Sequence, residues 1–183
     1  MFFRRKKDAP TFAYTDVELA NTISILGVTF TDDLKWNKHF DNILLSATRR
    51  LYVIRTLKPY VSKEKLLEVF LSCIVSLFMY ATPLFCDMST EMCHRIKKFR
   101  KRAHRVICSQ ECKYSIIPDF DNMHKSLSCK FLTKCKSPDH PLHEHVPPKM
   151  PCTGHFCLPH FSTFRRQNSF FIWCCMIDNA AEI

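Results

Sequence analysis

Residues 36–54 read WNKHFDNILLSATRRLYVI, and the spacing of their apolar side chains decides the class of fold. The apolar positions recur every three or four residues, which is the period of a helix with one face turned to a core. They are Trp36, Phe40, Ile43, Leu44, Ala47, Leu51 and Ile54. Pro59 cannot continue a helix and is expected to end this one. The stretch predicts a long amphipathic helix.

Two more helices are predicted after Pro59. Residues 66–86 carry one charge, Glu68, and Ser62 is a suitable N-cap ahead of them. A run this apolar could span a membrane. Glu68 and two serines recur within it, however, and Pro83 interrupts it, so we favour a central helix buried on most sides. Ser89 or Thr90 is predicted to cap the third helix, which has an apolar stripe from Met92 to Ile107.

The remaining segments show weaker patterns. Short strands are predicted at 12–15 and 23–30, and Asp32 and Asp33 lie where the N-terminus of the first helix would favour negative charge. Residues 120–134 fit a further amphipathic helix. Six prolines between 137 and 159 predict a loop that buries little, and the aromatic stretch 164–177 is expected to pack back onto the protein. The fold class is therefore mainly α, with a short N-terminal β-hairpin.

Composition narrows the functions. The chain has 183 residues, 27 Lys or Arg against 17 Asp or Glu, a net charge of +10 and only two glycines. Phosphate loops and dinucleotide fingerprints need clustered glycines, so both are excluded. No catalytic set of side chains stands out, and we expect no independent enzyme. The positive charge favours a polyanionic partner, nucleic acid before membrane.

The positive charge is concentrated in the third predicted helix. Seven cations and no acidic residue lie between positions 95 and 105: Arg95, Lys97, Lys98, Arg100, Lys101, Arg102 and Arg105. Such a run is often only a solvated face. Like charges at helical spacing cost stability unless something external neutralises them, so we favour contact with nucleic-acid phosphates. Arg49 and Arg50 of the first helix are added to this predicted site.

Eleven cysteines cannot all pair internally, and the N-terminus does not resemble a secretory leader. We therefore expect free thiols in an intracellular protein of the nucleus or cytoplasm, not a secreted one. Cys152, His155, Cys157 and His160 are zinc-ligand types, but C-x2-H-x-C-x2-H lacks the spacer between ligand pairs that zinc sites use. Zinc is not favoured. A zinc-binding interaction module at 129–160 remains the alternative function.

Several blocks, in order, resemble the C-terminal part of reverse transcriptases from non-LTR, LINE-type retrotransposons of the Jockey-like group. The blocks are Ile25-Leu26-Gly27-Val28-Thr29-Phe30, Leu34-Lys35-Trp36 with His39, Arg49 to Arg55, Val61-Ser62, Ser76 to Ala81, Phe99 to Ile107, His140-Pro141-Leu142, and Arg166 with Asn168-Ser169-Phe170 and Asn179. The sequence departs from the family at Ile172, where proline is usual, and at 154–160, where arginines are usual. Decay of arginine codons to Cys and His would explain the second departure.

The resemblance implies a palm-edge remnant at 1–33, a thumb-like helical bundle at 34–112 and a Pro/Cys/His-rich tail, partly disordered, at 113–183. The partners it implies are template–primer RNA and DNA and the missing palm and fingers. Phe30-Thr31-Asp32-Asp33 is close to the family's Y-x-D-D signature. Two-metal chemistry needs carboxylates from two strands, and a helix start follows here, so we expect a turn that caps the helix instead. No catalytic residue or cofactor is expected in this chain; Mg²⁺ belongs to the full parent enzyme.

Overall fold

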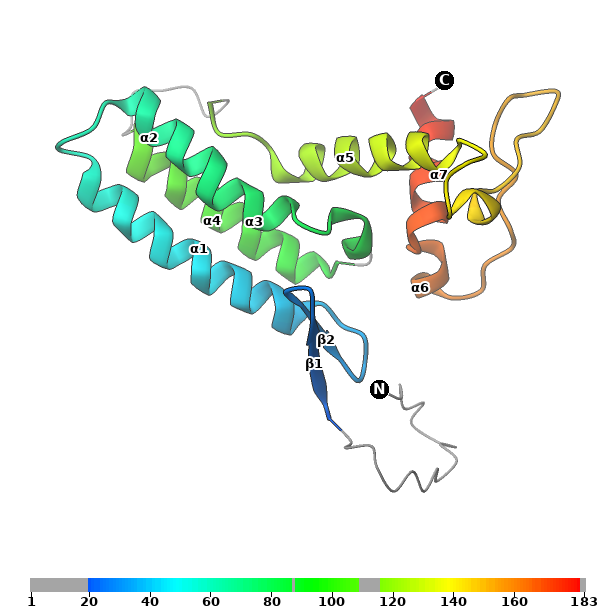
Figure 1. The fold of residues 1–183 in the computed structure, drawn as a ribbon, viewed down its shortest axis with the longest axis horizontal. Helices are drawn as coiled ribbons and strands as arrows, with labels where there is room; N and C mark the ends of the chain where they lie inside the picture. The colour runs from blue at the N-terminus through cyan, green and yellow to red at the C-terminus, as the bar shows by residue number, and fades with distance from the viewer. Residues whose placement is uncertain (1–19, 87, 109–115, 182–183) are drawn as a thin grey trace.

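The computed structural model describes residues 20–86, 88–108 and 116–181. It is mainly helical with a two-stranded antiparallel hairpin near its N-terminal end, as the sequence predicts (Figure 1). The strand predicted at 12–15 and the boundary predicted at 112–113 lie outside the described residues.

The hairpin pairs β1 (Thr22–Ile25) with β2 (Val28–Thr31). The single strand predicted at 23–30 is therefore wrong, because the chain turns at Leu26 and Gly27. Both residues have positive φ, 49° and 79°, as tight hairpin turns require. The Tyr80 hydroxyl donates a hydrogen bond of 2.8 Å to the Leu26 carbonyl, which ties the turn to the helices.

α1 (Asn37–Leu57) is the helix predicted from the opening stretch, and all of its buried residues except His39 come from the predicted stripe. The next helix differs from the prediction. It consists of α2 (Lys63–Phe70), the wider π-helical turn η1 (Leu71–Val75) and α3 (Ser76–Met79), and it stops before Pro83. The helix ends where the backbone of Tyr80 becomes extended and Ala81 takes a positive φ of 53°. The chain continues through a 3-10 turn, η2 (Thr82–Phe85).

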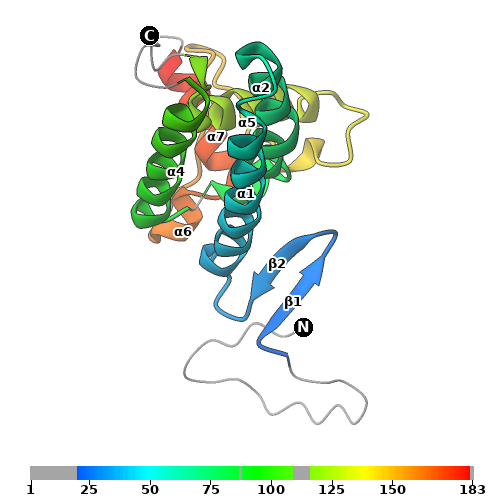
Figure 2. The same ribbon diagram turned by 90° about the vertical axis from the view of Figure 1, so that its left-hand side faces the viewer.

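α1, the α2–α3 segment and α4 (Thr90–Cys108) lie side by side in a three-helix bundle (Figures 1 and 2). Their main core includes Phe40, Phe70, Phe78 and Phe99, and it extends to Val28 of the hairpin and to Phe120 beyond the bundle. Because the bundle has only three helices, each helix has one side exposed to solvent. The α2–α3 segment is therefore not buried on most sides as predicted, and Val69, Leu71 and Cys73 are exposed.

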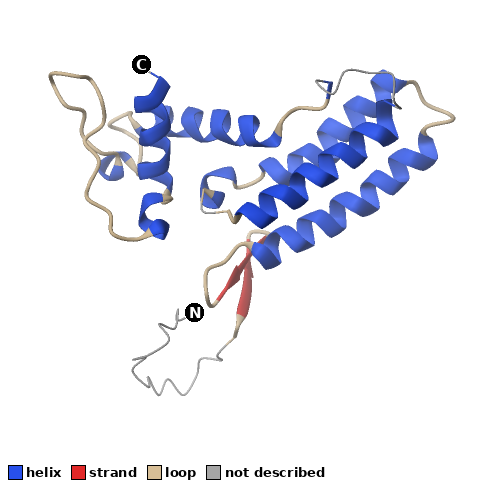
Figure 3. Cartoon of the chain, turned by 180° about the vertical axis from the view of Figure 1, so that it is seen from behind, coloured by secondary structure: helices blue, strands red, loops and turns tan. Residues whose placement is uncertain are grey.

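α5 (Phe120–Cys135), at the predicted position, runs from the bundle to α7 (Phe170–Ala181), which is preceded by α6 (Phe164–Gln167) (Figure 3). A second apolar cluster forms between α5 and α7, around Leu132, Cys174 and Cys175. The predicted packing of 164–177 is thus confirmed.

The segment between α5 and α6 is loop, as predicted, with one short 3-10 turn, η4 (His143–His145). The expectation that this loop buries little is wrong at one position. Phe156 is 3% exposed within the second cluster. The Asn179 side chain accepts a hydrogen bond from the Phe156 amide (2.8 Å) and donates one to its carbonyl (3.2 Å). One aromatic side chain and one amide anchor the loop to α7.

Candidate nucleic-acid interface

α4 carries the predicted basic site, and its sequence explains its position in the bundle. The Ser89 hydroxyl accepts a hydrogen bond from the Met92 amide (3.3 Å), so Ser89 is the capping residue of the two predicted. Met92, Ile96, Phe99, Ala103 and Ile107 are buried, as predicted from their spacing. The seven cations occupy the rest of the helix surface, and the structure divides them into three groups.

Arg95 and Arg102 face α1. Arg95 forms an ion pair of 2.6 Å with Asp41, and the Arg102 guanidinium donates to the Thr48 hydroxyl at 2.8 Å. Arg102 also lies over the Phe99 ring, 5.5 Å from its centre. Both arginines therefore contribute to holding the two helices together.

Lys97 and Arg100 face the start of α5. Lys97 pairs with Asp121 at 2.7 Å, and this hydrogen bond raises the pKa of the Lys97 ammonium. Arg100 donates to the Ile117 carbonyl at 2.7 Å and pairs with Asp119 at 3.2 Å, and its side chain is only 13% exposed. Arg100 thus connects α4 to the residues that precede α5.

Lys98, Lys101 and Arg105 form the third group, which we call the basic face. All three are exposed. None has a hydrogen bond or an ion pair with any residue in the described part of the chain. Their spacing of three and four residues places them on one side of α4. The surface available to a polyanion is therefore narrower than the seven cations predicted from sequence.

The two arginines predicted from α1 differ in their contacts. Arg49 is exposed on α1. Arg50 instead donates a hydrogen bond to the Cys73 carbonyl, inside η1. Its position supports the packing of α1 against the second helix.

Two cations at the C-terminal end of α1, not predicted as part of the site, lie next to Arg105 of the basic face. Arg55 and Lys58, with Arg102, Arg105 and Val106, line a hollow of about 380 Å³ between the C-terminal ends of α1 and α4. In the sequence, Arg55 and Lys58 are two cations at the C-terminal end of a predicted helix. Their favourable interaction with the helix dipole is enough to explain cations at such positions. Only the packing of α1 on α4 shows that they share a surface with Arg105.

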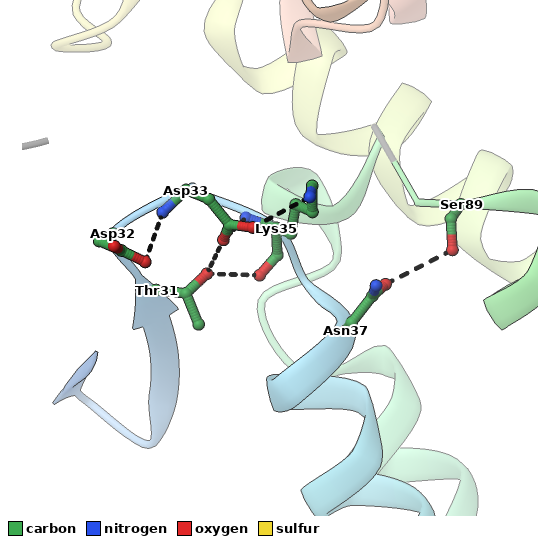
Figure 4. A network of polar contacts seen from close by, with 6 residues as sticks. All are labelled: Thr31, Asp32, Asp33, Lys35, Asn37 and Ser89. Atoms are coloured by element: carbon green, nitrogen blue, oxygen red, sulfur yellow. Dashed lines mark hydrogen bonds and ion pairs between the residues drawn. The ribbon is translucent and has the colours of Figure 1, made fainter. Parts of the chain in front are cut away.

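Asp32 and Asp33 lie in the turn between β2 and α1 (Figure 4). The Asp33 carboxylate accepts hydrogen bonds from the Thr31 hydroxyl (2.6 Å) and the Lys35 amide (3.1 Å). The Thr31 hydrogen bond lowers the pKa of Asp33 to about 2. α1 begins four residues later without a side-chain cap, so the prediction that these residues cap the helix is wrong. Asp33 instead shapes the turn.

The four zinc-ligand types of the tail lie around the turn that contains Gly154. Cys152, Cys157 and His160 are exposed and His155 is half-buried. The backbone there forms a narrow bridge between Lys149 and Phe156. Within the described ranges, no three His, Cys, Asp or Glu side chains are grouped closely enough to hold a metal ion.

No helix in the described residues has both the length and the apolar character needed to cross a membrane. Comparisons with models of known protein families, with curated proteins and with solved structures find no match to this chain.

Proposed function

We propose that this chain binds nucleic-acid backbones through the basic face of α4, as the C-terminal, thumb-like part of a non-LTR retrotransposon RNA-directed DNA polymerase. The observation that carries the binding proposal is the basic face itself. Lys98, Lys101 and Arg105 are exposed, lie on one side of a helix, and have no acidic partner in the described part of the chain. The resemblance described above supports the parent family.

The chemistry of this surface is electrostatic. Each Lys or Arg that meets a phosphate releases counterions from the nucleic acid, and this release drives binding without regard to base sequence. Phosphate contacts position a strand, whereas contacts to base edges specify it. The proposed partners are therefore RNA and DNA of a template–primer, inside the cell, together with the palm and fingers that would supply carboxylates and Mg²⁺.

Binding is tested with Lys98→Gln/Lys101→Gln in the full chain. Affinity for a duplex of fixed length is measured by fluorescence anisotropy over a range of salt concentrations. The log–log salt slope should flatten by about two units, because each lost phosphate contact removes about 0.9. The loss should be equal for unrelated duplex sequences.

The matched control is Lys130→Gln/Lys134→Gln on α5, which removes the same charge from exposed positions elsewhere. The control should leave most of the slope intact. Equal losses in both double variants would mean that general basicity drives binding and would refute the basic face as its site.

The parent family is tested separately on nucleotide sequence. Genomic DNA upstream of the coding sequence should encode a palm with a Y-x-D-D signature, in frame or separated by disabling mutations. Upstream sequence with no trace of a palm would contradict the assignment.

A further inference from the structure

The contact between α1 and α4 changes character along its length. At its first end, Arg95 of α4 is paired with Asp41 of α1 at 2.6 Å. Seven residues further along both helices, Arg102 donates to Thr48 at 2.8 Å. Seven residues are two helical turns, so the helices run parallel and in register. Seven residues after Thr48, the α1 residue is Arg55. Here α1 presents a cation, whereas Asp41 and Thr48 each accept a hydrogen bond or ion pair from α4.

The hollow between the C-terminal ends of α1 and α4 is located next to Arg55. Its described lining consists of Arg55, Lys58, Arg102, Arg105 and Val106, and no residue of this described lining carries a carboxylate. Its volume is about 380 Å³, and it is open to solvent rather than enclosed. The guanidinium groups of Arg55, Arg102 and Arg105 converge there, and none of them is ion-paired with a residue that the structure describes. Like charges this close repel one another, which favours the entry of an anion.

The helix dipoles explain why Lys58 lies at the end of α4, but they do not explain the positions of all the cations at the hollow. Lys58 donates a hydrogen bond of 2.8 Å to the Val106 carbonyl, one of the carbonyls that the last turn of α4 leaves unpaired. Arg102 is held by Thr48. Arg55 and Arg105, in contrast, have no hydrogen bond or ion pair to any residue that the structure describes. Two guanidinium groups at the hollow are thus available to an external ligand.

We propose that the hollow between the C-terminal ends of α1 and α4 binds a phosphate group, held by Arg55 and Arg105. Guanidinium groups bind phosphate oxygens with paired hydrogen bonds, and two of them match a group with several charged oxygens. Arg105 belongs to both the hollow and the basic face. The phosphate is therefore one of the strand that lies along α4, and this choice of source rests on the proposed function.

The experiment uses Arg55→Gln/Arg105→Gln in the full chain, with pyrophosphate and a duplex as separate probes. Lys98→Gln/Lys101→Gln is the matched control, because it removes two charges outside the hollow. Pyrophosphate affinity, measured by calorimetry at low salt, should fall at least about tenfold in the hollow variant, since charged hydrogen bonds are lost. It should change less than about twofold in the control. All four side chains are exposed, so melting temperatures should stay close to that of the unchanged chain.

Duplex binding identifies the source of the phosphate. The hollow variant should also bind the duplex more weakly, and pyrophosphate should compete with the duplex on the unchanged chain. Weaker pyrophosphate binding with unchanged duplex binding would show that the site takes a free polyphosphate and would overturn the strand as its source. Unchanged pyrophosphate affinity in Arg55→Gln/Arg105→Gln would overturn the hollow as a phosphate site, even if the basic face still binds duplex. Loss of pyrophosphate binding in a protein that never binds duplex would support the hollow and refute the proposed function.

Discussion

The single residue His39 is a buried ionisable group, and its environment favours the neutral form of its imidazole. It is 4% exposed beneath the hairpin and stacks on Phe85, with ring centres 5.1 Å apart. Its Nδ1 accepts a hydrogen bond of 3.3 Å from the Thr29 amide, and its Nε2 has no partner among the described residues. Protonation would remove the acceptor and place a charge in an apolar core. Burial accordingly lowers the pKa of His39, and also that of His124.

These two lowered pKa values predict that acid destabilises the fold. The unfolded histidines titrate near pH 6.5, above their folded pKa values, so the unfolded state binds more protons as the pH falls. The free energy of unfolding should therefore decrease as pH drops below about 6.5 and level off below the folded pKa values. Urea denaturation at pH 7.5 and pH 5 measures the change.

The control for this pH effect is His39→Gln/His124→Gln, in which the decrease between pH 7.5 and pH 5 should be much smaller. Asp33, with its pKa near 2, titrates far below this window. An equally large decrease in the double variant would assign the acid sensitivity to other groups.

α4, at the element scale, shows how the neighbours of a helix select which of its charges remain available. Its cations differ little in type, yet Asp41, Asp119 and Asp121 engage Arg95, Arg100 and Lys97. The exposed ion pairs among these contribute little stability, of order 0–1 kcal/mol each. Their larger effect is to neutralise two sides of the helix and leave the third side positive.

This division predicts that Asp121→Asn strengthens nucleic-acid binding. The change removes a carboxylate beside α4 and releases Lys97, which could then meet a phosphate. The salt slope for duplex binding should steepen by up to about 0.9, one further contact. The matched control is Asp178→Asn, which breaks the pair of 3.2 Å with Lys136 between α5 and α7. A slope increase of the same size in the control would mean that only net charge matters.

The described part of the molecule contains two apolar clusters, one in the bundle and one between α5 and α7, and the cysteines divide between core and surface. Cys108, Cys135, Cys174 and Cys175 are buried, whereas Cys73, Cys152 and Cys157 are exposed. Burial raises the pKa of Cys135 and raises that of Cys175 to about 11. Because the thiolate is the reactive form, burial and the raised pKa values both disfavour reaction at Cys135 and Cys175.

The separation predicts the order of thiol modification at the scale of the whole fold. With an alkylating reagent at pH 7.5, Cys73, Cys152 and Cys157 should react first. The four buried thiols should react only under denaturing conditions. Peptide mass spectrometry after timed quenching reports each site. Adding Zn²⁺ should leave Cys152 and Cys157 reactive; their protection by zinc would instead favour the interaction module at 129–160.

The sequence alone determined the apolar stripes of α1 and α4 and the types of side chain on their surfaces. The stripes of α1 and α4 were predictable because a period near 3.6 places their apolar residues on one face whatever packs there. Ser89 was predictable as a cap because capping depends on the next three residues. The hairpin was only partly predictable. Its turn uses Leu26 at positive φ, a conformation that leucine rarely adopts.

Only the tertiary structure decided which cations remain available and which of them share a surface. Asp41 is more than fifty positions from Arg95, and Asp121 is twenty-four from Lys97. No local pattern could assign these partners. Arg55 and Arg105 lie fifty positions apart and meet at one hollow because α1 and α4 pack in parallel. Charge and helical period are local properties of the chain. Which cations are paired with a carboxylate, and which cations meet at one surface, depends on the distant residues that the core brings together.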